Sequence, residues 1–484
     1  MKSAPGTTRK SIQKISPIDV YKLLPKTNCG ECNEANCIAF ATRLVNGELV
    51  LSGCPPLFTE KYARAREALE ELMEPPVRAV TFGTGKNAVT IGGKYVLWRH
   101  EFTYHNPTAV AIDVHDQMTP DELVKRVGSI AQFTYNYIGR TLSFNAVAVR
   151  SVTKDPAMFA AAVRTVAGAT DLPLILCTLD PAVMKAGLEK VRDRRPLIYA
   201  ANADNWSAMA DLALEAGVPL VVSAPGDPTL LRSLARTLLN YGVNDLVLDP
   251  GTFAGNGLPE TISTFTDIRT QACRQFDELF GFPLLGLPLA VWTGDEISED
   301  VLKWKEAVLA SMLMSRYADI LIMHSLDGWV LLPQLIWRFN LYTDPRKPVS
   351  VEAGVKPFGR PDKNSPVLVT TNYALTYFTV ESDIKAANLD CYLIVADTGG
   401  LSVESAVAGR IFTAESIATA LKEYSIADLV DHTTLIIPGL AARLSGETEE
   451  ATGWKILVGP KDSSGIPQFL REHWRKERTE DPQP

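Results

Sequence analysis

The chain is 484 residues long, 46% of them hydrophobic and 21% charged, with a formal net charge of −8. These values are typical of a globular protein of roughly two to four domains, and they exclude the basic surface that nucleic-acid binding requires. No apolar run approaches the roughly 18 residues that cross a bilayer, and the polar N-terminus lacks the apolar core of a secretory signal. We therefore expect a cytoplasmic protein with no membrane span and no nucleic-acid partner.

Four of the seven cysteines lie near the N-terminus with the spacing C-x2-C-x4-C-x16-C; they are Cys29, Cys32, Cys37 and Cys54. Structural zinc, a disulfide pair and an iron–sulfur cluster are the three alternatives. Zinc sites usually combine two short cysteine knuckles or add histidines, and here no histidine precedes His100. Disulfides are uncommon in a reducing cytosol. Four clustered thiolates suit a [4Fe–4S] cluster, and proline follows Cys54, as in ferredoxin-type sequences.

Helices are predicted on both sides of the last cysteine. Cys37 opens the run "CIAFATRLV", for which Asn46-Gly47 is a stop signal. The run "TEKYARAREALEELMEPP" has helical spacing and ends at two prolines. The following "TFGTGKNAVTIGGK" is rich in glycine and threonine and predicts a linker or a hairpin. We expect a cluster domain at 1–75 and a linker at 76–94.

The stretch "YKLLPKTNCGECNEANCIAFATRLVNGELVLSGCPPL" closely resembles the N-terminal module of the large subunit of corrinoid iron–sulfur proteins. The archaeal members of that family are gamma subunits of the acetyl-CoA decarbonylase/synthase complex. The resemblance implies that the four cysteines hold a [4Fe–4S] cluster.

Residues 95–340 alternate short apolar runs with helical stretches. The runs are 109–114, 145–150, 172–177, 196–201, 218–224, 245–250, 283–291 and 318–324. Eight buried strands joined by helices predict a (β/α)8 TIM barrel, with a doubly wound sheet as the alternative. The resemblance implies a barrel here as well. The chain is therefore expected to be an α/β protein.

Polar residues follow several of these runs, namely Asp113, Asn202, Asp204, Asp249 and His324. Barrel enzymes place their chemistry at these strand ends, and Asn and Asp side chains there could bind a pterin ring. Helix capping is the alternative. We prefer capping, because the resemblance implies a barrel that acts mainly as scaffold and subunit interface.

The C-terminal third predicts a second α/β domain at 366–476, after a Gly- and Pro-rich hinge at 341–365 and before a charged, disordered tail at 477–484. Its predicted strands are 366–371, 391–397, 433–439 and 454–460. Each ends in small or polar residues, and ligands of open parallel sheets bind beyond the carboxyl ends of the strands. No G-x-G-x-x-G or Walker sequence is present, so a dinucleotide or nucleoside triphosphate is poorly supported.

The resemblance implies that this Rossmann-like domain binds a corrinoid. Carried over by position, one edge of the pocket is Thr370, Thr371, Asn372 and Thr376. The residues under the corrin ring near cobalt are Thr398, Gly399, Gly400, Leu401 and Ser402, where Leu401 replaces a hydroxyl of some relatives. The residues at the periphery or the nucleotide tail are Gly439, Gly459, Pro460 and Ser463.

A cobalt-binding histidine is not expected in the C-terminal domain. The motif D-x-H-x-x-G has its nearest match at Asp113-Val114-His115, in the barrel, with Met118 at the glycine position. His432 follows Asp431 directly and does not fit either. The corrinoid would therefore be base-off with no protein histidine ligand, which favours reduction to Co(I).

The resemblance implies a corrinoid methyl carrier of the Wood–Ljungdahl (reductive acetyl-CoA) pathway. Co(I) accepts a methyl group from methyl-tetrahydropterin and donates it to the nickel site of acetyl-CoA synthase, and the cluster reduces stray Co(II). No catalytic side chain is assigned, because the cofactor carries the chemistry. The implied partners are a small corrinoid-protein subunit forming a heterodimer, a methyl-tetrahydropterin methyltransferase, acetyl-CoA synthase/CO dehydrogenase, and a low-potential ferredoxin or similar reductant.

Two other functions stay open. An iron–sulfur electron carrier or scaffold subunit without corrinoid would keep the cysteines but needs no small-residue strand ends. A pterin-binding barrel methyltransferase would use Asn202 and Asp249 directly.

Overall fold

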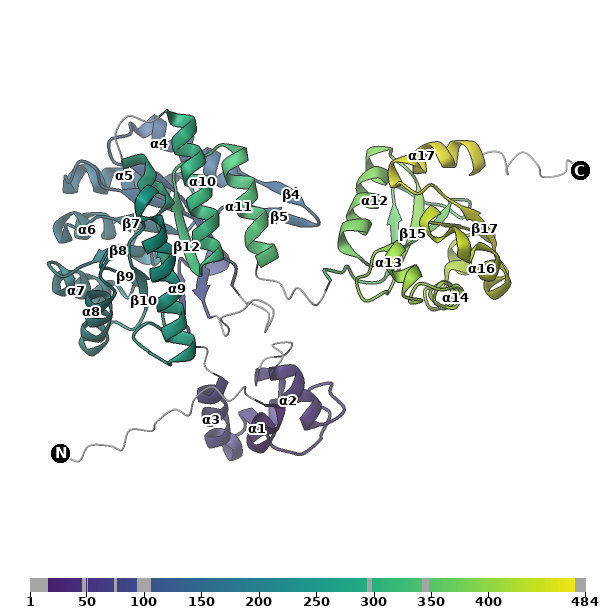
Figure 1. The fold of residues 1–484 in the computed structure, drawn as a ribbon, viewed down its shortest axis with the longest axis horizontal. Helices are drawn as coiled ribbons and strands as arrows, with labels where there is room; N and C mark the ends of the chain where they lie inside the picture. Colours follow the sequence, from purple (N-terminus) through teal and green to yellow (C-terminus); the bar gives the residue numbers. More distant parts are fainter. Residues whose placement is uncertain are drawn as a thin grey trace, which may run out of the picture. The chain divides into compact units, whose positions relative to one another are not determined.

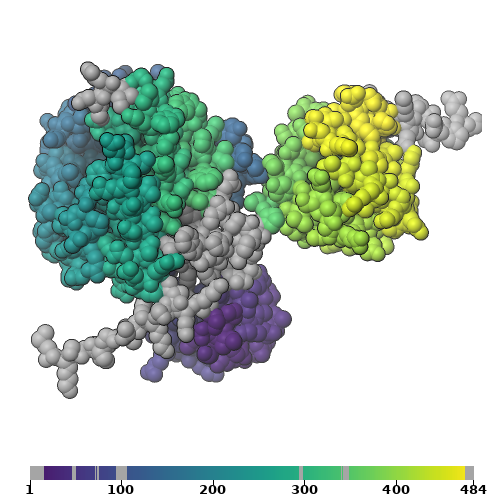
Figure 2. All heavy atoms as spheres, in the orientation of Figure 1, coloured from purple at the N-terminus to yellow at the C-terminus, as the bar shows by residue number. Residues whose placement is uncertain are grey.

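The computed structural model describes residues 16–45, 49, 51–73, 76–93, 106–293, 298–341 and 348–474. The chain divides into two compact units, Met1–Tyr135 with Leu142–Asp344, and Asn136–Thr141 with Pro345–Pro484 (Figures 1 and 2). The predicted tail 477–484, the Asn46-Gly47 stop signal and His100 lie outside the described residues. Within the described part of the chain, no helix has the length and apolar character needed to cross a membrane.

The N-terminal module contains three short helices, α1 (Pro17–Leu23), α2 (Cys37–Val45) and α3 (Ala63–Met73). Ser16 caps α1 in a reciprocal capping box with Asp19. The Ser16 side chain accepts from the backbone N–H of Asp19, and the Asp19 side chain accepts from the backbone N–H of Ser16. The predicted helix at 37–45 is confirmed, and the predicted run after Cys54 forms α3 preceded by 3-10 turns. Val20, Phe40 and Leu69 are fully buried in the module's own core, which also contains Cys37 and Cys54.

A hairpin of β1 (Ala79–Phe82) and β2 (Val89–Gly92) follows the module. Its side chains Val80, Phe82 and Ile91 belong to the same buried cluster as the inward-facing residues of the barrel. Gly83 lies at φ +81°, and a Cβ there would come within 2.6 Å of Pro173, so the turn requires glycine. The hairpin therefore closes the barrel at the amino ends of the barrel strands. The sequence predicted either a linker or a hairpin here, and the hairpin is confirmed.

Eight parallel strands form a closed barrel in chain order, with β12 pairing back onto β3. They are β3 (Ala109–His115), β6 (Ala146–Arg150), β7 (Leu174–Cys177), β8 (Leu197–Ala201), β9 (Leu220–Ser223), β10 (Leu246–Asp249), β11 (Leu284–Gly286) and β12 (Ala318–Met323). All eight predicted strands are confirmed. Because the sheet closes, the doubly wound alternative is wrong. The strands are buried on both faces, as their continuous apolar runs indicated.

Helices cover the outside of the barrel (Figure 1). They are α4 (Pro120–Gln132), α5 (Pro156–Ala169), α6 (Pro181–Leu188), α7 (Trp206–Ala216), α8 (Pro228–Tyr241), α9 (Leu258–Arg274), α10 (Glu299–Ser315) and α11 (Gly328–Leu341). Asp155, Asp180 and Asp227 cap α5, α6 and α8, each before a proline in the first turn, the usual chemistry of a helix start. A small hairpin of β4 (Tyr135–Tyr137) and β5 (Arg140–Leu142) lies between α4 and β6; the sequence did not predict it.

The second unit contains a five-stranded sheet in the order β13-β15-β14-β16-β17. The four predicted strands are present and parallel: β14 (Val367–Thr371), β15 (Cys391–Ala396), β16 (Thr434–Ile437) and β17 (Lys455–Val458). The fifth, β13 (Gly354–Phe358), pairs antiparallel with β15. It lies inside 341–365, for which the sequence predicted only a hinge.

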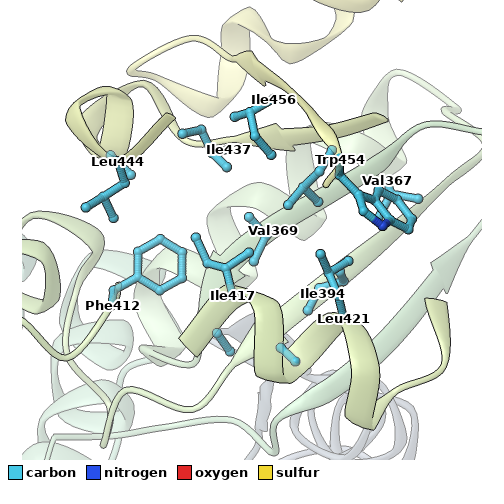
Figure 3. Packing of buried hydrophobic residues seen from close by; sticks show 14 of the residues in the cluster. Val367, Val369, Ile394, Phe412, Ile417, Leu421, Ile437, Leu444, Trp454 and Ile456 are labelled. Carbon is cyan, nitrogen blue, oxygen red and sulfur yellow. The ribbon is translucent and has the colours of Figure 1, made fainter. Parts of the chain in front are cut away.

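Helices pack on both faces of this sheet. They are α12 (Ala374–Ala386), α13 (Val403–Ala408), α14 (Ala414–Glu423), α15 (Ile426–Leu429), α16 (Ser445–Thr452) and α17 (Ile466–Phe469). One face packs Leu368, Val395 and Ile436 against α12 and α17. The other packs Val369, Ile394 and Ile437 against α13, α14 and α15. Figure 3 shows side chains of this second core, among them Phe412, Ile417 and Leu421 together with the sheet residues Val369, Ile394 and Ile437.

Candidate functional site

The loop that carries the first three cysteines is curled by residues with left-handed backbone. Asn28, Gly30 and Asn33 have φ of +47°, +75° and +59°, a conformation that asparagine and glycine adopt at low cost. The side-chain oxygen of Asn28 accepts a 2.9 Å hydrogen bond from the backbone N–H of Cys37. This bond ties the start of the loop to the start of α2.

All four predicted ligands line one small cavity, namely Cys29, Cys32, Cys37 and Cys54. Leu24 and Phe40 form apolar parts of its wall, and none of the four cysteines is in a disulfide. Burial raises the pKa of the Cys54 thiol, a backbone hydrogen bond from Leu57 partly opposes this, and the negative charges of the other three cysteines raise the pKa further. Four thiolates gathered there therefore require a positive charge between them.

The donor set of the cavity consists of four cysteines, and no histidine among the described residues lines it. In a cubic cluster each thiolate binds its own iron, so the sulfurs stand farther apart than the four ligands of one zinc ion. Four thiolates lining one cavity fit an iron–sulfur cluster.

The C-terminal sheet reverses its strand order between β14 and β16, because β15 lies on the other side of β14. β14 pairs with β15 as far as Thr371, but with β16 only at Val367 and Leu368. The carboxyl half of β14 therefore has no strand partner on the β16 side. Ligands of open α/β sheets bind at such a reversal, beyond the carboxyl ends of the strands.

Two predicted corrinoid contacts lie at this reversal. Thr370 and Thr371 end β14 and are only 2% and 0% exposed, and neither hydroxyl has a hydrogen-bond partner among the residues that the structure describes. Since successive strand residues face opposite sides, the two hydroxyls lie on opposite faces of the sheet. A buried hydroxyl without a partner costs about 1–3 kcal/mol, a cost that the polar rim of a ligand would remove.

Asn372, also a predicted contact, organises the neighbouring loop. Its side-chain oxygen accepts hydrogen bonds from the backbone N–H of Thr398 (3.0 Å), the Thr398 hydroxyl (3.0 Å) and the backbone N–H of Gly400 (2.9 Å). Its amide donates to Asp397 at 2.9 Å. With four bonds inside the protein, this side chain positions the loop after β15.

An open groove of about 550 Å³ runs along this edge and is lined by Asn372, Asp397, Gly399 and residues 348 and 350–353. Small-molecule sites have volumes of about 300–1,000 Å³. Gly399 lies at φ +65°, and a Cβ added there would have no atom within 4 Å, so this backbone faces open space. Asp397 and the segment before β13 were not among the predicted site residues; Asp397 could have been found because it directly follows β15.

The predicted glycine contacts in the loops after β16 and β17, Gly439 and Gly459, pack against each other. A Cβ on Gly439 would lie 2.7 Å from the Gly459 carbonyl oxygen, and the Gly439 N–H donates to the Pro460 carbonyl at 3.0 Å. Gly439 is therefore required by the close approach of these two loops, and its Cα does not face open space.

The remaining predicted contacts are dispersed. Leu401 packs against the hydrophobic core beneath its loop, and Ser402 caps α13. Thr376 is half-buried on α12, and Ser463 donates a hydrogen bond to Asp383 of the same helix. The structure therefore brings Thr370, Thr371, Asn372 and residues 398–400 together, but not these four.

His432 lies away from the carboxyl edge, just before β16 begins. Its Nε2–H donates to the Ser365 carbonyl at 3.0 Å, and its Nδ1 accepts from the Thr434 N–H at 3.2 Å. Both ring nitrogens are therefore used within the protein. His473, the other histidine described in the second unit, donates from Nδ1 to the Phe469 carbonyl and stacks on its ring.

The barrel residues that the sequence assigned to helix capping fall into two groups. The side-chain oxygen of Asn202 accepts from the backbone N–H groups of Asp204 and Asn205, in the turn before α7. Asp113, Asp204, Asp249 and His324 make no side-chain hydrogen bond to the start of a helix among the described residues, so the capping prediction is wrong for these four. Strand periodicity turns Asp113, Asp249 and His324 into the barrel interior instead.

Asp113 is the centre of a charged group. One carboxylate oxygen accepts from Nε of Arg150 at 2.6 Å, and the other lies 2.6 Å from Nδ1 of His324 and 3.4 Å from Nη2 of Arg126. Burial alone would raise the Asp113 pKa, but the hydrogen bond and charge of His324 and the charges of both arginines outweigh it and lower the pKa.

Asp249 has only neutral partners. It accepts from the hydroxyls of Tyr199 and Ser223, each at 2.8 Å, and from the Gly251 N–H at 2.9 Å. Burial raises its pKa more than these bonds lower it. The pKa values of the two carboxyls at this end of the barrel, Asp113 and Asp249, are therefore shifted in opposite directions.

The fold and the two sites define a protein with a cysteine-lined cluster module, a closed parallel barrel and a second α/β domain with an open strand edge. Residues 24–56 match the family model "Putative Fe-S cluster", and residues 79–470 match "CO dehydrogenase/acetyl-CoA synthase delta subunit".

The chain is 46% identical to acetyl-CoA decarbonylase/synthase complex subunit gamma of Methanosarcina acetivorans, over 95% of this chain and 98% of that one. It is 44% identical to the subunit gamma of Methanothermobacter thermautotrophicus, over 94% and 98%. Dihydropteroate synthase of Thermus thermophilus aligns at a TM-score of 0.37 and 16% identity, over 54% of this chain and 99% of that one, which is too low to carry an argument. The chain belongs to the family of the acetyl-CoA decarbonylase/synthase complex gamma subunits.

Proposed function

We propose that this chain is the corrinoid-bearing methyl carrier of an acetyl-CoA decarbonylase/synthase complex. The observation that carries the proposal is the presence, in one member of this family, of a cavity lined by four cysteines and a sheet edge with two unpartnered buried hydroxyls. When bound, the cofactors would supply a cobalt that takes a methyl group from methyl-tetrahydropterin and passes it to the nickel site of acetyl-CoA synthase, and a [4Fe–4S] cluster that keeps the cobalt reduced.

The cysteine cavity would hold the cluster. Its four thiols share one space, and the Fe–S family model covers all of them. The match to the Fe–S family model favours the cluster over zinc. Asn28 and Gly30 would position the loop, and the buried Cys37 and Cys54 would shield the cluster from water on the side of the module's core.

The carboxyl edge of the C-terminal sheet would hold the corrinoid. The Thr371 hydroxyl would meet the polar rim of the ligand, and the Gly399 backbone leaves room for a flat macrocycle. Asn372 would hold the loop at 398–400 in shape before the ligand binds, which lowers the ordering cost of binding.

The position of His432 supports a corrinoid without a histidine from this domain. Its two ring nitrogens are bonded within the protein at the start of β16, whereas the open edge lies where the strands end. The proposed partners are a small corrinoid-protein subunit, a methyl-tetrahydropterin methyltransferase, acetyl-CoA synthase/CO dehydrogenase and a low-potential ferredoxin or similar reductant.

The test is the iron and cobalt content of the protein purified without oxygen from cells that also make the small subunit. We expect about four irons and about one cobalt per heterodimer, with a Co(I) corrin spectrum under strong reductant. Cys54→Ser should lose the iron and keep the cobalt, whereas Cys391→Ser, in the other unit, should keep both. Iron without cobalt after corrinoid reconstitution would leave an electron carrier, and zinc in place of iron would refute the cluster.

A further inference from the structure

The barrel interior changes character at the carboxyl ends of its strands. Below this end, the inward-facing residues are apolar, for example Ala111, Ile175 and Val247. By strand alternation, the last inward-facing positions are Asp113, Arg150, Cys177, Tyr199, Ser223, Asp249, Leu287 and His324. Polar groups inside a barrel are costly unless they are paired, and a scaffold would have no need of them here.

Half of this polar end is complete in itself. The hydroxyls of Tyr199 and Ser223 donate to Asp249, and both donors are uncharged. Asp116, at the rim, is also complete, because it accepts from the hydroxyls of Ser151 and Thr153 and from two backbone N–H groups. Neither group has donors left to offer a ligand.

The other half keeps free donors. Arg150 uses Nε for Asp113, and its two terminal nitrogens have no hydrogen-bond partner among the described residues. His324 uses Nδ1 for the same carboxylate, and its Nε2 has no partner among them either. The two side chains are 27% and 26% exposed, so small molecules can reach both. Asp113 therefore orients two polar groups whose free ends face away from it.

The charged groups of this half are Arg126 and Arg150, the carboxylate of Asp113, and the buried carboxylate of Glu306, which accepts hydrogen bonds from the backbone N–H groups of His324 and Ser325. Arg126 and Arg150 both contact Asp113, which is the one carboxylate they contact within the described residues. Arg126 is held further by the carbonyl oxygens of Asp113 and His324. The ring of Trp292 lies 4.6 Å from that of His324 and forms an aromatic wall beside it. A positively charged fork beside an aromatic wall is suited to an anion.

We propose that the carboxyl end of the barrel binds a small molecule through an oxyanion group, a carboxylate or a phosphate. The terminal nitrogens of Arg150 donate two parallel hydrogen bonds to it. His324 Nε2 accepts from a hydroxyl of the ligand when neutral, and donates to the anion when protonated. Asp113 is a positioning residue that fixes both side chains. This site lies in the barrel and is independent of the corrinoid proposal.

The experiment uses the full-length protein with its cofactors, and the probes are inorganic phosphate and acetate at low ionic strength. Diethylpyrocarbonate modification of His324 is followed by peptide mass spectrometry, and binding by calorimetry. We expect at least one probe to slow the modification of His324 and to give a calorimetric signal. Arg150→Gln should weaken that binding by roughly ten- to a hundredfold, as loss of a charge-assisted pair does. The affinity of Arg150→Lys should lie between that of the unchanged protein and that of Arg150→Gln, because lysine keeps the positive charge but lacks the two parallel donors of the guanidinium.

Arg164→Gln, an exposed arginine on the outer helix α5, is the matched control and should bind like the unchanged protein. Phosphate binding without acetate binding identifies a phosphate ligand, and the reverse identifies a carboxylate. The proposal is overturned if neither probe protects His324, or if Arg150→Gln and Arg164→Gln have the same effect. Arg150→Lys, which keeps the contact to Asp113, tests the same point if Arg150→Gln fails to fold.

Discussion

The barrel and the C-terminal sheet both present the carboxyl ends of parallel strands, but they prepare these ends differently. In the barrel, Asp113 is buried and bonded by Arg150 and His324. In the sheet, Thr370 and Thr371 are equally buried, and their hydroxyls have no hydrogen-bond partner in the described part of the chain. The first edge is charged and paired in advance, and the second is neutral and unpaired.

The difference follows from the cost of burial. A buried charge without a partner costs far more than a buried hydroxyl without one, so a charged site must pair itself before a ligand arrives. A neutral edge can be left unpaired at about 1–3 kcal/mol per hydroxyl. The sheet edge therefore suits a large ligand with a neutral polar rim, and the barrel end suits a small anion.

The largest expected effect is that of Asp113→Ala. It leaves Arg150 and Arg126 without the carboxylate, and breaking a buried pair from one side costs about 3–5 kcal/mol. We expect the lower end, about 3 kcal/mol, because both arginines reach water. Hydrogen exchange of the β3 and β6 peptides should quicken accordingly, while peptides of the second unit stay unchanged. Asp171→Ala, an exposed aspartate of the same unit, is the control, and an equal effect there would refute the assignment.

Asn372→Ala should have the next largest effect, at the other edge. It removes the acceptor of three hydrogen bonds and the donor of a fourth, which we expect to cost about 2–3 kcal/mol because the donors stay buried. Exchange should quicken at residues 397–402, and less corrinoid should be retained. Asn364→Ala, an exposed asparagine in the same unit, should change neither quantity. A loop that keeps its protection in Asn372→Ala would contradict this role.

Residue patterns predicted the parts of the fold that are buried on both sides. The eight barrel strands and four sheet strands are continuous apolar runs, because both of their faces are covered. β13 contains a proline and is mostly half-buried, as edge strands are. Its sequence therefore has no continuous apolar run from which a strand could be predicted. The strands of the β4–β5 hairpin have three residues each, too few for a period to appear.

The sites differ in the same way. The four cysteines were predictable because thiols have few other reasons to cluster. The role of Asn372 was not, because it depends on the loop after β15 lying beside β14, which residue spacing does not determine. Asp113 and Asp249 were assigned to capping, since the same residue types cap helices and line barrel ends. Their true places follow from the closed barrel.

Thr371→Val tests whether the sheet edge is prepared for a ligand. Valine has nearly the same shape and no unpaired hydroxyl, so without corrinoid the second unit should become more stable by about 1 kcal/mol. Corrinoid retention should fall, because the hydroxyl is the group proposed to meet the ligand. The readouts are unfolding in denaturant and cobalt content. Thr379→Val removes a hydroxyl that already bonds Leu375 and should leave cobalt content unchanged. If Thr371→Val lowers stability without corrinoid, the hydroxyl has a partner in the protein.

The smallest expected effect concerns pH, and it separates the two carboxyls of the barrel end. Burial raises the Asp249 pKa, so the folded state binds more protons than the unfolded one, and stability falls as pH rises from about 4 through the raised value. Asp249→Asn cannot titrate and should lack this part of the decline. The Asp113 pKa is lowered, so its contribution is present above about pH 4 and is lost on acidification. The measurement is denaturant unfolding between about pH 2 and pH 8. In Asp249→Asn the fall in stability above about pH 4 should be smaller, whereas Asp113→Asn should lower stability at neutral pH and reduce the loss of stability below about pH 4. Parallel profiles for the two variants would mean that the carboxyls share one environment, contrary to the separate networks around them.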